Sequence, residues 1–361
     1  MAMSAAEPAR LGVADDADPA LAPSLRVEAE ALLAAAISAV SGGLIGLVLG
    51  LVGVGTRLWG DGSIAAWGAA AAGVAASVSS ALGYWRARTT DGQQWRRQIA
   101  SWRYVMSTAS VVIAHGALAA IGTVALFAVL SRAFIDVELS VFWTTVLAGT
   151  ATGLSGWLSY LSASRMTTQR LTTLLVTFIG IGTLAAMITT SDPLWWKYHF
   201  SQLGTFGDMS SFLFNGTLVA GGLLVTTFTL YVTHDLTALR EAPRGIRIVS
   251  TALGVMGIML ACVGIFPVNV HMLLHNLSAS GMALMFLLLL VGGPWIVRRM
   301  PRAYFLASWA FLAGLVASIA LFVTGYFGLT AFEIIVFALI FGWLAVFIRF
   351  MVVADQPEPR G

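Results

Sequence analysis

The sequence predicts an all-α, polytopic integral membrane protein: a bundle of about ten transmembrane helices with both termini in the cytoplasm. Three observations support this fold class. Of 361 residues, 58% are hydrophobic and 10% are charged, whereas soluble domains carry about 25% charged residues. Apolar runs long enough to cross the ~30 Å hydrocarbon layer recur along the whole chain. The connections between these runs alternate between arginine-rich and arginine-poor.

The chain begins with a segment that does not resemble a cleaved signal peptide. Residues 1–30 are acidic, contain prolines and lack a basic stretch followed directly by an apolar core. We expect a flexible cytoplasmic tail, after which the first apolar run acts as an uncleaved anchor. Ten candidate spans follow, near 32–55, 63–85, 105–130, 141–162, 171–190, 211–233, 248–266, 273–297, 304–326 and 331–352. Residues 354–361 form a second short cytoplasmic tail.

The arginines predict how the bundle is oriented. They cluster in every second connection, at Arg86, Arg88, Arg96, Arg97 and Arg103, then Arg165 and Arg170, then Arg240, Arg244 and Arg247, then Arg298, Arg299 and Arg302. Cytoplasmic loops are enriched in Lys and Arg. The sequence therefore predicts a multi-pass protein of the plasma membrane, in which these connections and both termini face the cytoplasm.

The first four spans, residues 31–165, form an Ala- and Gly-rich half. Gly42, Gly46 and Gly50 recur at four-residue spacing, which creates a groove that another helix can approach closely. That helix belongs either to a second copy of the chain, giving a homo-oligomer, or to the same bundle. Residues 73–87 and 149–163 also align without gaps, which suggests a two-helix repeat.

The second half, residues 166–353, is predicted to be a six-helix domain with an outward-facing polar pocket. Two polar segments interrupt its apolar runs: a first joint, "YHFSQLGTFGD" (198–208), and a second joint, "PVNVHMLLHN" (267–276). Both fall on the outer side, so we expect them to share one pocket for a lipid or other ligand. The candidate pocket residues are Trp196, His199, Ser201, Asp208, Asn215, Asn269, His271, His275 and Asn276.

The histidines of the second joint allow two interpretations. His271 and His275 are four residues apart, so on a regular helix they face the same side. Such a pair suits Zn²⁺, with His199 or Asp208 as a third ligand, and metal-activated water would then attack a lipid ester. Alternatively, the histidines hydrogen-bond to nearby loops, because no Glu follows His271 as in the zinc-protease motif.

Other side chains add candidate catalytic residues or argue against particular cofactors and partners. Glu333 lies close to the outer end of the last span, where an acid is usually functional or paired. The candidate catalytic residues are therefore His199, Ser201, Asp208 and Glu333. Haem is not expected, because His115 stands alone in mid-span and the histidines do not form two stacked pairs. No phosphate-binding loop, G-x-S-x-G elbow or nucleic-acid motif is present, so we expect no nucleic-acid partner.

The two joints resemble a known family. "HFSQLGTFGDMSSFLFNGTLVAGGLL" and, later, "GIFPVNVHMLLHNLSASGMAL" are similar to the family catalogued as domain of unknown function 998. The matching positions are Ser201, Leu203, Gly204, Phe214, Asn215, Gly264, Phe266, Pro267 and His271 or His275. The resemblance covers about residues 170–352. That family is distantly similar to the Frag/DRAM/Sfk group of membrane proteins, which implies a lipid-related role.

Three functions follow from these observations. The favoured one is a non-catalytic membrane protein that binds lipid or a membrane partner in its outer pocket. The alternative is an integral-membrane, zinc-dependent or metal-free lipid hydrolase or lipid-remodelling enzyme built on the His, Asp and Ser side chains. A transporter is third, because the spans contain few charges and no clear inverted repeat.

Overall fold

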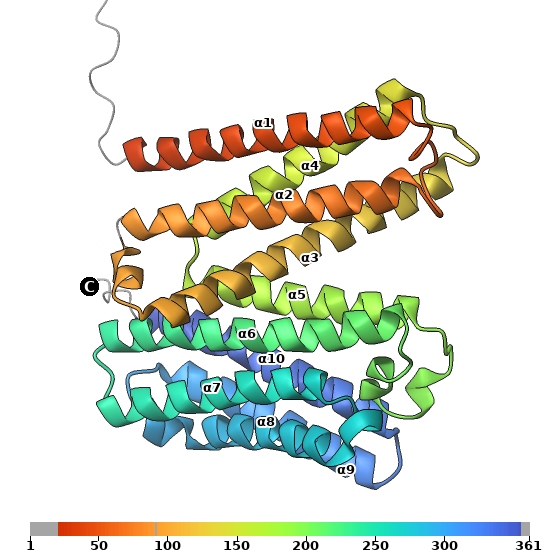
Figure 1. Cartoon of the computed structure of the whole chain (residues 1–361). Coiled ribbons are helices and arrows are strands. Elements are labelled where there is room, and N and C mark those ends of the chain that lie inside the picture. Colours follow the sequence, from red (N-terminus) through yellow and green to blue (C-terminus); the bar gives the residue numbers. More distant parts are fainter. Residues whose placement is uncertain (1–20, 91, 355–361) are drawn as a thin grey trace, which may run out of the picture.

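The computed structural model describes residues 21–90 and 92–354, which form ten long α-helices arranged as one bundle (Figure 1). The helices are α1 (Leu21–Leu51), α2 (Ile64–Arg86), α3 (Ser101–Ala133), α4 (Val141–Ser164), α5 (Thr168–Thr189), α6 (Met209–Ala238), α7 (Pro243–Ile265), α8 (Val268–Ile296), α9 (Arg302–Val323) and α10 (Leu329–Ala354). Short 3₁₀ helices η1 (Ala87–Thr89), η2 (Gln94–Arg97), η3 (Trp195–Lys197) and η4 (Phe200–Gly204) lie in the connections. Over this described range the all-α prediction is confirmed.

The amino-terminal boundary differs from the prediction. Because α1 begins at Leu21, residues 21–30, which were expected to belong to the tail, are helical. Arg26 and Glu30 lie one helical turn apart and form an ion pair of 3.2 Å, which is compatible with helix in this polar stretch. The rest of that tail, 1–20, and residues 355–361 lie outside the described residues.

Nine of the ten described long helices are long and apolar enough to cross a membrane. The remaining one, α4, is rich in Gly, Ser and Thr, which lowers its hydropathy. These small side chains face α1 and α2; for example, Thr152 Oγ1 donates to the carbonyl of Ser38 on α1 at 2.9 Å. Its 24 residues extend about 36 Å. A multi-pass membrane protein is therefore supported.

The helices pack in two sets that meet along α3. Helix α4 lies against α1 and α2, and α2 lies against α3, whereas α5 to α10 pack among themselves. Helix α3 also contacts α5 and α6, and Ser110 Oγ lies 2.8 Å from Thr227 Oγ1 of α6. The described helices thus form two packing sets that are bridged by α3.

The glycine stripe of α1 faces α4 of the same chain. A Cβ added to Gly42 would lie 1.9 Å from Thr152 Oγ1, and one on Gly46 would lie 2.6 Å from the carbonyl oxygen of Thr144. Gly50 likewise approaches Val141, at 3.0 Å. In this structure the three glycines therefore allow a close approach of α4 to α1.

The two segments aligned as a repeat contact each other. Residues 73–87 lie on α2 and residues 149–163 lie on α4. A Cβ on Gly83 would lie 2.8 Å from the carbonyl oxygen of Tyr160, and a Cβ on Gly156 would lie 3.2 Å from Ser79 Oγ. The small residues shared by the two segments therefore serve close helix packing.

One end of the bundle, which we call the arginine-rich end, holds the connections α2–α3, α4–α5, α6–α7 and α8–α9, on the left of Figure 1. Arg96 of η2 is 1% exposed and lies over the Tyr84 ring, with its guanidinium carbon 3.7 Å from the ring centroid. Tyr84 Oη also lies 2.6 Å from Ser107 Oγ and accepts a hydrogen bond from Tyr231 at 3.2 Å. This polar cluster joins α2, α3 and α6.

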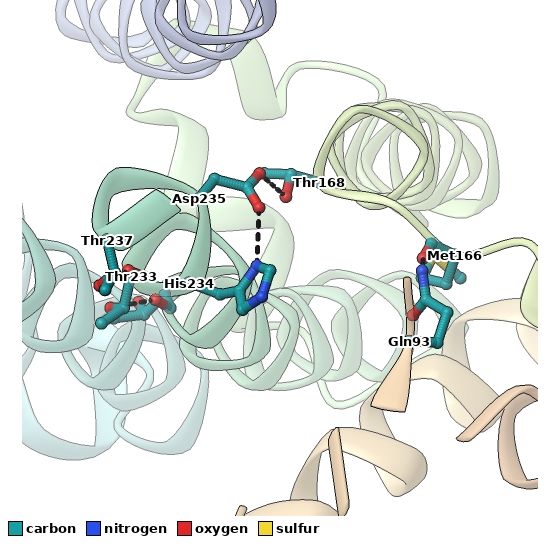
Figure 2. A network of polar contacts seen from close by, with 8 residues as sticks. Gln93, Met166, Thr168, Thr233, His234, Asp235 and Thr237 are labelled. Carbon is teal, nitrogen blue, oxygen red and sulfur yellow. Dashed lines mark hydrogen bonds and ion pairs between the residues drawn. The ribbon is translucent and has the colours of Figure 1, made fainter. Parts of the chain in front are cut away.

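A second set of contacts at this end is drawn in Figure 2. Thr168 donates to one carboxylate oxygen of Asp235, and His234 Nδ1 lies 3.1 Å from the other. The amide of Gln93 donates to the carbonyl of Met166 at 2.9 Å. The start of α5, the end of α6 and the α2–α3 connection are thereby tied together.

Candidate functional site

The two joints lie at the opposite end of the bundle from the arginines, on the right of Figure 1. They touch directly, because the Asn269 amide donates to the carbonyl of Thr205 at 3.2 Å. Ser201 of the first joint and His275 of the second also line one cavity. The expectation that the two joints meet is therefore confirmed.

The cavity has a volume of about 470 Å³, within the usual range for small-molecule sites. Five elements enclose it: η4, α6, α7, α8 and α10. Most of its walls are apolar, and they come from Phe200, Phe214, Leu218, Leu260, Val263, Ala279, Met282, Ala283, Leu329, Phe332, Val336, Phe337 and Ile340. Ser201, His275, Asn276, Ser280 and Glu333 are its polar members.

The main polar groups are held at the joint end of the cavity. Ser201 Oγ lies 3.0 Å from His199 Nδ1. The Glu333 carboxylate accepts hydrogen bonds from the backbone N–H groups of Phe200 and Ser201, which ties α10 to η4. His275 is buried, with Nδ1 2.9 Å from the carbonyl oxygen of Phe266. Each of these side chains thus has a defined partner.

Aromatic rings pack beside these polar groups. The Phe200 ring makes edge-to-face contacts with Phe214 of α6, at 5.1 Å between centroids, and with Phe337 of α10, at 5.8 Å. Such contacts stabilise a pair by about 0.5–1.5 kcal/mol beyond area burial. The rings hold η4 against α6 and α10, and they form part of the apolar wall of the cavity.

Residues of the family-like motifs hold the first joint against α6. The Asn215 amide donates to the carbonyl of Gly204 at 2.9 Å. A Cβ on Gly204 would lie 2.4 Å from Asn215 Oδ1, and a Cβ on Gly264 of α7 would lie 2.5 Å from the Asn215 carbonyl oxygen. Leu203, the neighbour of Gly204, is fully buried. These motif positions therefore build the support of the site and do not line it.

Electrostatics in the first joint favours a neutral imidazole and a charged carboxylate. Burial lowers the pKa of His199 below its ordinary value, and the neighbouring His275 lowers it further. Burial alone would raise the pKa of Asp208, but hydrogen bonds from Ser191 and Ser211 outweigh it and hold that pKa below its usual range. Near neutral pH, His199 is thus able to accept a proton.

Several predicted site residues lie outside the cavity. Asp208 caps α6 by accepting from the backbone N–H of Ser211 at 3.0 Å. Trp196 is exposed, with Lys197 Nζ 5.7 Å from its ring centroid, as at a membrane interface. Asn215, Asn269 and His199 hold the joints, as described above.

The expected pairing of His271 with His275 on one helix face is wrong. His271 has non-helical backbone angles (φ −150°, ψ 75°), which interrupt α8 one turn before His275. His271 is exposed and contacts the Phe266 ring, whereas His275 is buried. Within residues 21–90 and 92–354, no group of three or more His, Cys, Asp or Glu side chains is placed to hold a metal ion.

His115, the mid-span histidine, lies in α3, away from the joints. It is 6% exposed, and its Nδ1 lies 2.8 Å from the carbonyl oxygen of Val111 one turn earlier. His115 is thus a buried side chain that hydrogen-bonds within its own helix.

Sequence reasoning missed the apolar part of the site. On α10, Leu329, Phe332, Glu333, Val336, Phe337 and Ile340 line the cavity at intervals of three and four residues, which is one face of a helix. The spacing was visible in the sequence. The sequence could not show that this face lines a cavity, because apolar residues occupy nearly all positions around α10.

Residues 175–349 match the family model described as "Protein of unknown function (DUF998)". The DUF998 match runs from α5 to α10 and includes both joints and the whole cavity, whereas α1 to α4 lie outside it. The resemblance expected from the joints is thereby confirmed for the second half of the chain. No curated protein and no solved structure matches the chain.

Proposed function

We propose that the protein binds a membrane lipid in the cavity between α6, α7, α8 and α10, without changing it chemically. The observation that carries this proposal is one cavity whose walls are mostly apolar and whose polar members Ser201, His275 and Glu333 are held near the two joints. A lipid has the same division into an apolar chain and a polar head group. Its chain would lie against Phe214 and Phe337, and its head group beside Ser201 and His275.

The dimensions of the cavity suit one acyl chain. Its lining on α10 runs from Leu329, the first residue of the helix, to Ile340. Eleven residues of helix correspond to about 16 Å, which is close to half of the ~30 Å hydrocarbon layer. A chain in this cavity would therefore reach about as deep as a chain in one leaflet.

The exposed rim indicates how a lipid would enter. Asn276 and Ser280 of α8 and Leu329 of α10 are exposed at the edge of the cavity. No residue of α9 lines it. We infer that a lipid enters sideways between α8, at Asn276 and Ser280, and the first turn of α10, so that its chain never crosses water.

We also infer that the cavity opens to the outside of the cell. The positive-inside rule would place the arginine-rich end and both termini in the cytoplasm, with the protein in the plasma membrane. In a Cys262→Ala background, a cysteine at Ser191 should react with a membrane-impermeant maleimide on intact cells. A cysteine at Thr89 should react only after lysis, and the reverse pattern would reject this orientation.

Filling the cavity tests lipid binding. Ala283→Trp places a large ring among the lining residues, whereas Ala310→Trp adds the same ring to an exposed position on α9. We expect protein purified in mild detergent to lose its co-purifying lipid in Ala283→Trp and to keep it in Ala310→Trp. Equal lipid content in both variants, measured by mass spectrometry of the extract, would reject the proposal.

A second function, ester hydrolysis, is favoured by the 3.0 Å contact between Ser201 Oγ and His199 Nδ1. In that reaction Ser201 Oγ attacks the ester carbonyl, His199 takes its proton and passes it to the leaving alcohol, and water then releases the acid. One observation weighs against it. The backbone N–H groups of Phe200 and Ser201, the nearest donors for an oxyanion, are bound to Glu333.

A fluorophosphonate probe separates the two functions. An activated Ser201 would be labelled in the wild type, and His199→Gln would abolish the labelling. If Ser201 is not labelled while the cavity retains lipid, the protein is a lipid-binding protein. Labelling of Ser201 together with hydrolysis of an added ester substrate would instead show that the protein is a hydrolase.

A further inference from the structure

We propose a second lipid site at the arginine-rich end: a groove between α5 and α10 that holds the phosphate of an anionic glycerophospholipid on Arg349. The groove has a volume of about 360 Å³. It is lined by Gln169, Thr172, Thr173, Val176, Thr177, Ala345, Val346, Ile348 and Arg349. It lies at the opposite end of α10 from the cavity, and it does not depend on the function proposed above.

Arg349 is the feature that requires a partner. It lies within a span whose mean hydropathy reaches 2.5, and an ionisable side chain in such a span is costly unless it is paired. In the described part of the chain, the ion pairs involve Arg26, Arg86, Arg165 and His234, and none involves Arg349. Its side chain is exposed, so a ligand can reach it from the lipid phase.

The charge of the groove selects an anion. None of its described lining residues is acidic, and Gln169 contributes an amide donor. The hydroxyls of Thr172 and Thr173 donate to backbone carbonyls one turn earlier, at 2.8 and 3.2 Å. This leaves the Arg349 guanidinium as the main donor, and guanidinium binds phosphate through two parallel hydrogen bonds.

The depth of the groove matches a lipid and not a free ion. Arg349 is five residues from the end of α10, about 7 Å along the axis, which is near the head-group boundary. Val176 lies eight residues into α5, about 12 Å from its start. Gln169, Thr172, Thr173 and Arg349 therefore stand at head-group level. Val176, Ala345 and Val346 continue inward as a path for an acyl chain.

The test compares lipid retention by native mass spectrometry for phosphatidylglycerol and phosphatidylcholine, which differ in net charge. We expect the wild type to retain phosphatidylglycerol at least about tenfold better. Arg349→Gln should abolish the preference, and Arg349→Lys should restore part of it. Arg302→Gln removes an exposed charge at the same end but outside the groove, and it should keep the preference.

Val176→Trp blocks the groove without changing charge, and it should reduce phosphatidylglycerol retention as strongly as Arg349→Gln. Equal losses in Arg302→Gln and Arg349→Gln would show a general surface effect and overturn the proposal. The proposal would also be overturned if millimolar inorganic phosphate displaced phosphatidylglycerol and Val176→Trp retained as much phosphatidylglycerol as the wild type. That result would show a site for a free anion. Ala283→Trp should leave this preference intact, so failure here and failure of the cavity are distinguishable.

Discussion

Gly264 offers the sharpest test of how the candidate site is supported. It lies on α7 where that helix touches α6, and an added Cβ would lie 2.5 Å from the carbonyl oxygen of Asn215. The same Cβ would lie 3.0 Å from Val219 Cγ2 and 3.1 Å from Leu218 Cβ. Gly264→Ala must therefore displace the backbone of α6 at the residue that holds the first joint.

The cost can be worked from these distances. Ordinary van der Waals contact begins at 3.4 Å, so α6 and α7 would have to separate locally by about 1 Å, and such overpacking costs about 1–3 kcal/mol. Gly254→Ala, on the same helix, meets nothing within 4 Å. Both variants gain about 1 kcal/mol of helix propensity. The difference between them therefore isolates the overpacking cost.

Thermal unfolding in detergent, followed by tryptophan fluorescence, measures this difference. Since 1 kcal/mol shifts Tm by about 2–4 °C in domains of 150–250 residues, we expect Gly264→Ala to melt several degrees below Gly254→Ala. Lipid retention in the cavity should fall in Gly264→Ala alone, because Asn215 no longer holds Gly204 in place. If the two variants melt together, the close approach of α6 and α7 does not support the site.

Three further predictions address single interactions. Asn215→Ala removes the donor to Gly204 and should destabilise the protein by about 1–3 kcal/mol; hydrogen exchange should rise in residues 199–208, and unchanged exchange would show that the bond does not order the joint. His199 has a folded-state pKa below its ordinary value of 6.5, so the unfolded state binds the proton first as the pH falls. The contribution of neutral His199 to stability should therefore be fully present above about pH 6.5 and decline below it. His199→Gln should reduce the resulting slope of Tm against pH between pH 8 and pH 5, and an unchanged slope would contradict the assignment. Tyr84→Phe removes a hydroxyl shared with Ser107 and Tyr231 and should cost about 1–3 kcal/mol, whereas Tyr326→Phe, at an exposed position, should leave Tm unchanged.

The sequence by itself determined the class of the protein and much of its local structure. Composition and the length of the apolar runs were enough, because a lipid environment demands helices of about 20 apolar residues whatever their neighbours are. The alternation of arginine-rich connections predicted which connections share an end of the bundle. Short motifs around Gly204, Asn215 and Gly264 identified the DUF998 region, because close backbone contacts allow few side chains at such positions.

Only the tertiary structure decided which polar residues share a site. The helical periodicity that paired His271 with His275 failed because the backbone leaves helical geometry at His271, and a local kink leaves no periodic signal. The sequence alone did not name the helix that the glycines of α1 approach, and the structure places α4 of the same chain against them. The cavity wall on α10 could not be predicted, because apolar residues occupy nearly all positions around this helix. Only the positions of α6, α7 and α8 around α10 determine which of its faces lines the cavity.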